Sequence, residues 1–150
     1  MIGLVIFDWK RTLYDPDTKQ LIGGAIDLLE YFKSQNTPML LVGKGGEDMN
    51  DEVQRLGVKE YFNKIIFAQG EKDPDIFAQE MTKYDPKKTV FIGDRVRSEL
   101  EIGNKLGATT IWVKQGKFAD ELPEMRAQEP RFTVTSLSNL HKLCKGLLLA

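Results

Sequence analysis

The sequence predicts an α/β fold with three layers: a mostly parallel sheet of five to six strands and helices on both faces. Short apolar runs of strand length alternate along the chain with longer segments of helical periodicity. Glycine or an aspartate follows several of the apolar runs, as expected where buried parallel strands end at one edge of a sheet. Strands that alternate with helices are typical of parallel βαβ units.

The bulk composition fits one soluble domain over residues 1–150. Hydrophobic residues make up 41% and charged residues 29% of the chain, as in ordinary globular proteins. The net charge of −1 argues against nucleic acid or an anionic membrane as a partner. The single cysteine, Cys144, excludes an intrachain disulfide and a cysteine-based zinc site. The N-terminus does not have the pattern of a signal peptide, so we expect a cytoplasmic location.

The N-terminal part opens on an apolar run, residues 2–7, that ends abruptly in Asp8. This pattern predicts a buried parallel strand that delivers Asp8 to the carboxyl edge of the sheet, although a solvated turn aspartate is the alternative. Residues 14–20 contain the turn sequence Asp-Pro-Asp and predict a small hairpin or flap. Apolar residues at helical spacing predict an amphipathic helix over residues 22–34.

The remaining elements follow in alternation. Further strands are expected at residues 39–42, 65–67, 89–92, 109–113 and, at the edge of the sheet, 132–134. Further helices are expected at residues 48–56, at residues 73–84, after the 89–92 strand as far as residue 106, and from Ser136 or Ser138 to residue 147. Asp73-Pro74 is typical of a helix start, and Gly57 and Gly107 are typical of helix ends. Residues 114–131 are charged and predict a loop with a helical turn.

Two expected strands end in an aspartate, Asp8 and Asp94. Two carboxylates at neighbouring strand ends repel each other unless a cation lies between them. Mg²⁺ is the natural candidate, because it takes oxygen ligands and is usually shared with a substrate phosphate. One capping aspartate and one turn aspartate would be the alternative interpretation.

Around these aspartates the chain resembles the haloacid dehalogenase (HAD) superfamily, from Ile2 to about Leu140. Val5-Ile6-Phe7-Asp8 and Thr12-Leu13 match its first motif, an apolar strand followed by Asp-x-Asp-x-Thr. Val90-Phe91-Ile92-Gly93-Asp94 matches its last motif, and Glu99 falls where the second acid of that motif is expected. The resemblance implies a Rossmann-like HAD core in which Asp8 is the nucleophile and Asp94 and Glu99 hold Mg²⁺.

The remaining catalytic set departs from the family pattern. Lys10 stands where the family has an acid-base aspartate, and Gly43 stands where it has a phosphate-binding Thr or Ser. The motif lysine aligns with Glu71, and Lys72 comes one position later. Lys72 is expected either to reach the site from a loop or to be a solvated surface lysine. Backbone amides at Gly43 and at the following glycines are expected to remain for phosphate binding, with Lys44 adding positive charge.

Lys10 allows two interpretations. Its ammonium would lie near Asp8 and Asp94 and replace or weaken Mg²⁺, or it would point into solvent while its backbone carbonyl faces the metal. Trp9 is expected to pack under the flap rather than against substrate. His141, the only histidine, is expected to be a partly exposed helical residue.

The stretches on either side of Gly43 are filled by the expected flap, helices and strand, so we expect no cap domain and an open site. The resemblance predicts a HAD-type hydrolase, a slow Mg²⁺-dependent phosphatase with an aspartyl-phosphate on Asp8, acting on a phosphate ester or a phosphorylated macromolecule. The three departures at Lys10, Gly43 and Glu71 favour the alternative, a binding or regulatory module with impaired chemistry. An open site also suggests that a protein partner or a second copy of the chain covers it.

Overall fold

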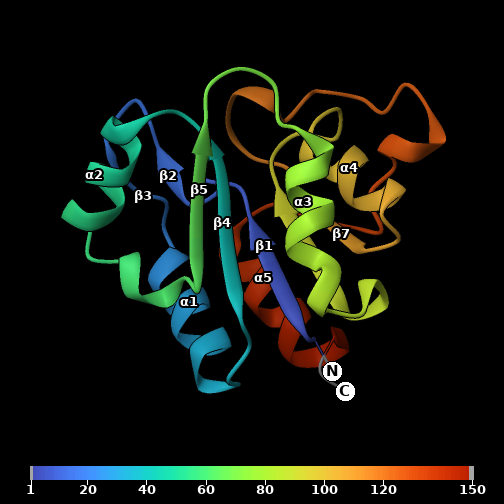
Figure 1. Cartoon of the computed structure of the whole chain (residues 1–150), viewed down its shortest axis with the longest axis horizontal. Helices are drawn as coiled ribbons and strands as arrows, with labels where there is room; N and C mark the ends of the chain where they lie inside the picture. The colour runs from blue at the N-terminus through green and yellow to red at the C-terminus, as the bar shows by residue number, and fades with distance from the viewer. Residues whose placement is uncertain (1, 149–150) are drawn as a thin grey trace.

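The computed structural model describes residues 2–148. Six strands form one sheet that is parallel throughout, in the order β5-β4-β1-β6-β7-β8 (Figure 1). The strands are β1 (Leu4–Phe7), β4 (Met39–Lys44), β5 (Lys64–Ala68), β6 (Thr89–Gly93), β7 (Thr109–Val113) and β8 (Phe132–Val134). All six expected strands are therefore confirmed, and the 132–134 strand lies at the sheet edge as predicted.

Helices cover both faces of this sheet, which confirms the three-layer α/β prediction (Figure 1). They are α1 (Ala25–Ser34), α2 (Glu47–Arg55), α3 (Pro74–Glu80), α4 (Glu99–Lys105) and α5 (Leu137–Leu143), with a π-helical turn at Cys144–Leu148. Buried side chains of α1, α2 and α5 pack on one face of the sheet, and those of α3 and α4 pack on the other. No helix of residues 2–148 is both long enough and apolar enough to cross a bilayer.

The core follows from the alternation of side chains along the central strands. In β1, Val5 and Phe7 point into one cluster, whereas Leu4 and Ile6 point into the other. All four side chains are buried, because a parallel sheet covered by helices on both faces excludes water from both. This continuous burial explains why the sequence of the strand is an unbroken apolar run up to Asp8.

The chain between β1 and α1 forms a small antiparallel hairpin, β2 (Tyr14–Asp15) and β3 (Gln20–Leu21). This confirms the predicted flap. Trp9 is fully buried beneath it, with its ring stacked on Tyr14 at a centroid distance of 5.1 Å. Trp9 therefore packs under the flap, as expected, and is not available to stack on a substrate.

Several helix boundaries differ from the prediction for local reasons. Helix α1 begins at Ala25 instead of residue 22, because Gly24 adopts a left-handed conformation with φ 91°. Helix α3 ends at Glu80 and continues as the 3₁₀ turn Met81–Lys83. The remaining 3₁₀ turns are Lys59–Tyr61, Pro86–Lys88, Gly116–Phe118 and Arg126–Gln128. The last two lie within residues 114–131 and confirm the loop with helical turns that was expected there.

The predicted helix starts are confirmed at two caps. The Asp73 carboxylate accepts a hydrogen bond from the Asp75 amide, with Pro74 at the first helical position of α3. The Ser136 hydroxyl accepts one from the Asn139 amide at the start of α5, so Ser136 and not Ser138 is the cap.

Candidate active site

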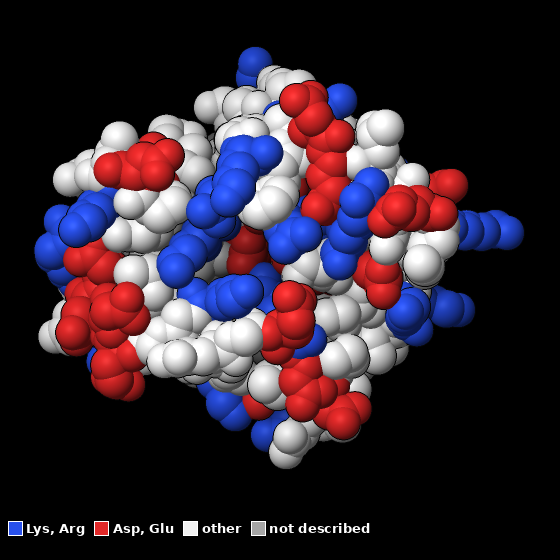
Figure 2. Space-filling view, turned by 90° about the horizontal axis from the view of Figure 1, so that it is seen from above, with Lys and Arg blue, Asp and Glu red and all other residues white. Residues whose placement is uncertain are grey.

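The carboxyl ends of the strands meet at one edge of the sheet, and a pocket of about 320 Å³ opens there. Figure 2 looks onto this edge and shows acidic atoms at the bottom of a hollow that Lys and Arg side chains surround. Asp8 follows β1 and Asp94 follows β6, and these two strands are neighbours. The Asp8 amide donates to the Ile92 carbonyl at 3.0 Å, so a hydrogen bond to β6 fixes the backbone of Asp8 at this edge.

Three carboxylates form the floor of the pocket: Asp8, Asp94 and Glu99. One oxygen of each lies within 4.8 Å of the others, and their residues are 8%, 2% and 3% exposed. Gly93 allows Glu99 to approach, because a Cβ atom at position 93 would collide with the Glu99 carboxylate. Glu99 Oε1 accepts hydrogen bonds from the amides of Asp94 and Arg95 at 3.1 and 3.2 Å.

The electrostatics of this floor fit a divalent cation. Burial, together with the charges of Asp8 and Glu99, raises the pKa of Asp94 to about 9. Burial and the charge of Asp8 also raise the pKa of Glu99. Among the described residues, Asp94 Oδ2 is buried without a hydrogen-bond partner. Clustered carboxylate oxygens with unsatisfied capacity are the ligand set that Mg²⁺ takes, so the residues fit the metal that the sequence predicts.

Lys72 supplies positive charge at the floor. Its ammonium lies 2.5 Å from Asp8 Oδ1 and 3.2 Å from Glu99 Oε2, and its side chain is 10% exposed. Burial disfavours the charged form, but the charges of Asp8 and Glu99 outweigh it and hold the pKa of Lys72 above its ordinary value. Lys72 therefore reaches the site from the loop between β5 and α3, and is not a solvated surface lysine.

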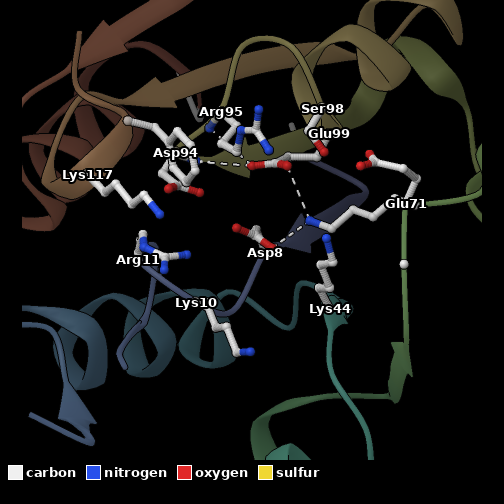
Figure 3. A pocket seen from close by; sticks show the side chains of 13 residues that line it. Asp8, Lys10, Arg11, Lys44, Glu71, Asp94, Arg95, Ser98, Glu99 and Lys117 are labelled. Atoms are coloured by element: carbon white, nitrogen blue, oxygen red, sulfur yellow. Dashed lines mark hydrogen bonds and ion pairs between the residues drawn. The ribbon is translucent and has the colours of Figure 1, made fainter. Parts of the chain in front are cut away.

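Lys10 does not take that position. In Figure 3 its side chain points away from the three carboxylates, and within residues 2–148 it forms no ion pair. The interpretation in which Lys10 is the tethered cation beside Asp8 is therefore wrong, because Lys72 occupies that place. Whether the backbone carbonyl of Lys10 contributes to a metal site stays a prediction.

Gly43, at the end of β4, lies against the aromatic packing under the flap. A Cβ atom there would meet Phe67 Cε1 at 2.7 Å and Trp9 Cβ at 3.0 Å. The Phe67 ring of β5 thus takes up the space that a Thr or Ser side chain would need. The expected extra amides are also engaged, since Gly45 donates to the Ala68 carbonyl at 3.0 Å and Gly46 donates to the Asp48 carboxylate at 3.1 Å.

Lys44 and Glu71 both line the pocket and are exposed. Lys44 extends toward the pocket from the end of β4 (Figure 3), consistent with the positive charge expected there. Glu71 stands at the sequence position of the missing motif lysine, but its neighbour Lys72 makes the ion pairs with the floor.

Sequence reasoning did not identify the opposite wall of the pocket, which includes Arg95, Lys117 and Phe118. Lys117 and Phe118 belong to the stretch that was predicted as a charged loop with a helical turn and was given no role in the site. A usable signal was present, because the strand at residues 109–113 ends at the same sheet edge as Asp8 and Asp94, so the loop after it had to face the same crevice.

Known proteins resemble this chain in sequence and in fold. A profile of the HAD-hydrolase-like family matches residues 73–140. Glyceraldehyde 3-phosphate phosphatases from Methanopyrus kandleri and Methanocaldococcus jannaschii are 23% and 26% identical over 90 and 103 residues, which is 56% and 65% of this chain. The crystal structure of a HAD-superfamily hydrolase from Ehrlichia chaffeensis superposes with a TM-score of 0.77 at 19% identity, and the match covers 98% of each chain.

The coverage of the curated relatives is partial. The matched region spans only 39% and 44% of the two phosphatases. The fold of the whole chain therefore has a known counterpart, whereas the sequence matches to the named phosphatases extend over part of each protein.

Proposed function

Starting from the confirmed resemblance to the haloacid dehalogenase superfamily in fold and family profile, we propose that the chain is a phosphatase that acts through an aspartyl-phosphate on Asp8. The observation that carries the proposal is the ammonium of Lys72 held 2.5 Å from Asp8 at the edge of a buried cluster of three carboxylates. A carboxylate nucleophile beside a fixed cation suits attack on a phosphoryl group, whose oxygens carry negative charge.

The first step is attack by an Asp8 carboxylate oxygen on the phosphorus of a phosphate ester. The new bond joins that oxygen to phosphorus, the bond from phosphorus to the ester oxygen breaks, and the leaving oxygen takes a proton from water. The Thr12 hydroxyl, 3.3 Å from Asp8 Oδ2, and the ammonium of Lys72 orient the carboxylate for this attack. Lys72 also balances charge on the phosphoryl oxygens.

The second step is attack by water on the phosphorus of the aspartyl-phosphate. The bond between phosphorus and the Asp8 oxygen breaks, which releases inorganic phosphate and restores the carboxylate. When bound, Mg²⁺ would add positive charge beside the phosphoryl group, with Asp8, Asp94 and Glu99 as the residues that hold it.

We expect this turnover to be slow. Lys10 points away from Asp8, so no side chain at that position protonates the leaving group or activates water. General acid-base catalysis typically contributes about 10²–10⁴-fold in rate. Gly43 adds a second loss, because it offers no hydroxyl to the phosphoryl group.

The same two departures support a second candidate, a binding or regulatory module that holds a phosphate group without turning it over. The Phe67 ring that fills the space at Gly43 favours this alternative, because it replaces a phosphate ligand by apolar packing. In either case the expected ligand is a phosphate ester or a phosphorylated macromolecule, and cover by a protein partner or a second copy remains part of the proposal.

The deciding experiment is hydrolysis of an aryl phosphate and a panel of small phosphate esters by the native chain, with Mg²⁺ and with a chelator. Phosphatase action predicts Mg²⁺-dependent turnover that Asp8→Asn abolishes. Asp51→Asn is the matched control, because it makes the same change at an exposed position on α2. Absence of turnover above Asp8→Asn on every ester would favour the binding module.

A further inference from the structure

The wall of the pocket opposite Lys72 carries two basic side chains with no role in the chemistry above. Arg11 comes from the turn after β1, and Lys117 comes from the 3₁₀ turn after β7. In Figure 3 these two side chains lie on one side of Asp8 and point toward the pocket, whereas Lys44 and Glu71, the sequence neighbour of Lys72, lie on the other side. A phosphoryl group on Asp8 would meet Lys72, which leaves this pair free to contact another part of the substrate.

The charges of this wall are not neutralised within the part of the chain that the structure describes. Arg95, on the same wall, forms an ion pair with Glu121 at 2.9 Å, but neither Arg11 nor Lys117 forms an ion pair within residues 2–148. Their charged groups instead lie 5.5 Å from the centre of the Phe118 ring, and the Arg95 guanidinium lies 4.2 Å from it. Cations gathered around one ring repel each other, and a bound anion would relieve that repulsion.

The backbone holds Arg11 in place at a conformational cost. Its φ is 66°, a left-handed conformation that glycine or asparagine adopts far more readily than arginine. The turn imposes it, since the Arg11 amide donates to the Tyr14 carbonyl at 2.6 Å and the amides of Thr12, Leu13 and Tyr14 all donate to the Trp9 carbonyl. A long charged side chain retained at a strained position next to a reactive site points to a use for that side chain.

The second cation is tied to the same turn. Gln115 Nε2 donates to the backbone carbonyls of Arg11 and Thr12 at 3.2 and 3.3 Å. A Cβ atom at Gly116 would lie 3.8 Å from Arg11 Cβ, so the two backbones are in close approach. The loop that carries Lys117 is therefore anchored to the turn that carries Arg11, and the two side chains belong to one structurally fixed basic surface.

We propose that Arg11 and Lys117, together with the Phe118 ring between them, form a second anion-binding subsite, so that the preferred substrates are phosphate esters whose leaving group carries another anionic group. That group is a carboxylate or a second phosphate, which share the oxygen acceptors that an arginine and a lysine bind. The substrate assignment rests on the proposed phosphatase function, but the subsite itself does not.

The wall also leaves room for such a leaving group. Arg11 and Lys117 line both the pocket over Asp8 and an adjoining cleft of about 390 Å³ beneath the hairpin. A leaving group that passes between the two cations would continue into this cleft and would not meet the core.

The test is calorimetric binding to Asp8→Asn with Mg²⁺ present, which separates binding from turnover. One pair of probes is glycerol 1-phosphate and 3-phosphoglycerate, which differ by a carboxylate. The other pair is glucose 6-phosphate and glucose 1,6-bisphosphate, which differ by a phosphate. We expect the second anion to tighten binding roughly tenfold in at least one pair, and the pair that responds identifies the anion.

In the background of Asp8→Asn, Lys117→Gln and Arg11→Gln are expected to remove this preference. Binding of the probe whose phosphate is its only anionic group should change by less than about twofold. Arg11→Gly is the second variant at that position, because it removes the charge and relieves the backbone. Lys114→Gln is the control, since it makes the same charge change in the same loop outside the pocket. Equal binding of both members in both pairs, or a preference that survives loss of both cations, would overturn the subsite.

The two proposals fail separately. Suppose that the binding preference is lost when the two cations are replaced, but the native chain hydrolyses none of the four probes. This result would support the subsite and contradict the phosphatase function. Suppose instead that esters with and without the second anionic group are hydrolysed with equal kcat/KM and show no binding preference. This result would support the phosphatase function and contradict the subsite.

Discussion

The two halves of the sheet edge differ in how they build the site. At the ends of β1 and β6, Asp8, Asp94 and Glu99 occupy the positions that the sequence motifs predict and converge within 4.8 Å. At the ends of β4 and β5, Gly43 carries no ligand and the cation comes from Lys72, one residue away from the expected position. The positive charge beside Asp8 is therefore present although it comes from the residue after the motif position, whereas apolar packing takes the place of the phosphate-binding hydroxyl.

The largest expected effect separates Lys72 from Lys10. Lys72→Met leaves three buried carboxylates without the ammonium that contacts two of them, and breaking a buried pair typically costs about 3–5 kcal/mol in the free energy of unfolding. Lys10→Met is the matched variant in the same pocket, and a change within about 0.5 kcal/mol is expected because its side chain points away. Urea unfolding in the absence of divalent cations measures both, and equal losses would contradict the assignment of Lys72 as the buried cation.

The metal prediction concerns the half of the edge that matches the sequence motifs, at the ends of β1 and β6. Mg²⁺ bound by the floor should stabilise the native chain by about 2.7 kcal/mol at a concentration of 100 Kd. Asp94→Asn should abolish most of that gain, because it removes a buried carboxylate whose Oδ2 has no hydrogen-bond partner within residues 2–148. Thermal unfolding with Mg²⁺ and with a chelator measures the effect, and Asp120→Asn, at an exposed position, is the control. If millimolar Mg²⁺ did not stabilise the native chain, the prediction would be wrong, and Lys72 would be the cation that balances the negative charge of the three carboxylates.

The altered half of the edge is tested at Gly43. Gly43→Ser places a Cβ atom 2.7 Å from the Phe67 ring, and overpacking of this kind typically costs about 1–3 kcal/mol. Gly23→Ser should be nearly neutral by comparison, since a Cβ atom there has nothing within 4 Å.

Combining Gly43→Ser with Phe67→Val should recover part of the loss, which a double-mutant cycle in urea unfolding would detect as favourable coupling. Strict additivity of the two changes would contradict the idea that the Phe67 ring excludes a hydroxyl side chain at position 43.

The smallest expected effect concerns the flap that covers Trp9 beside Gly43. Hydrogen bonds from Arg55 and from the Tyr14 hydroxyl lower the pKa of Glu52 to about 2. A carboxylate with a lowered pKa stabilises the fold above its unfolded-state pKa, and that contribution disappears as the pH falls from about 4.5 to about 2. The gap in unfolding free energy between the native chain and Glu52→Gln should therefore close over this range, and a gap independent of pH would contradict the assignment.

The sequence was sufficient to predict the fold and the half of the site that matches the sequence motifs. Short apolar runs of strand length predicted all six strands. The parallel pairing of β1 and β6 then brings Asp8 and Asp94 to the same edge of the sheet. Glycine and aspartate at element ends marked many of the boundaries. The start of α1, where a left-handed glycine delays the helix, and the end of α3 at Glu80 differ from the prediction.

The rest of the site depends on loops whose course local sequence does not determine. Lys72 and Lys117 both sit in loops, and their contacts follow from tertiary anchors such as the hydrogen bonds of Gln115 to the turn after β1. The obstruction at Gly43 comes from Phe67 on the neighbouring strand, a contact that periodicity alone cannot assign. Motif alignment likewise identified Lys10 as the residue at the acid-base position, but it could not predict that its side chain points away from Asp8.

The most direct test of the account is the covalent state of Asp8 during turnover. The native chain, incubated with an aryl phosphate and Mg²⁺ and quenched in acid, would be digested and analysed by mass spectrometry. Because the side chain at position 10 points away from Asp8, breakdown of the intermediate should be slow, and the peptide that contains Asp8 should accumulate one phosphoryl group that Asp8→Asn lacks. Turnover of the ester with no phosphoryl group on that peptide, or turnover that persists in Asp8→Asn, would contradict the assignment of Asp8 as the nucleophile.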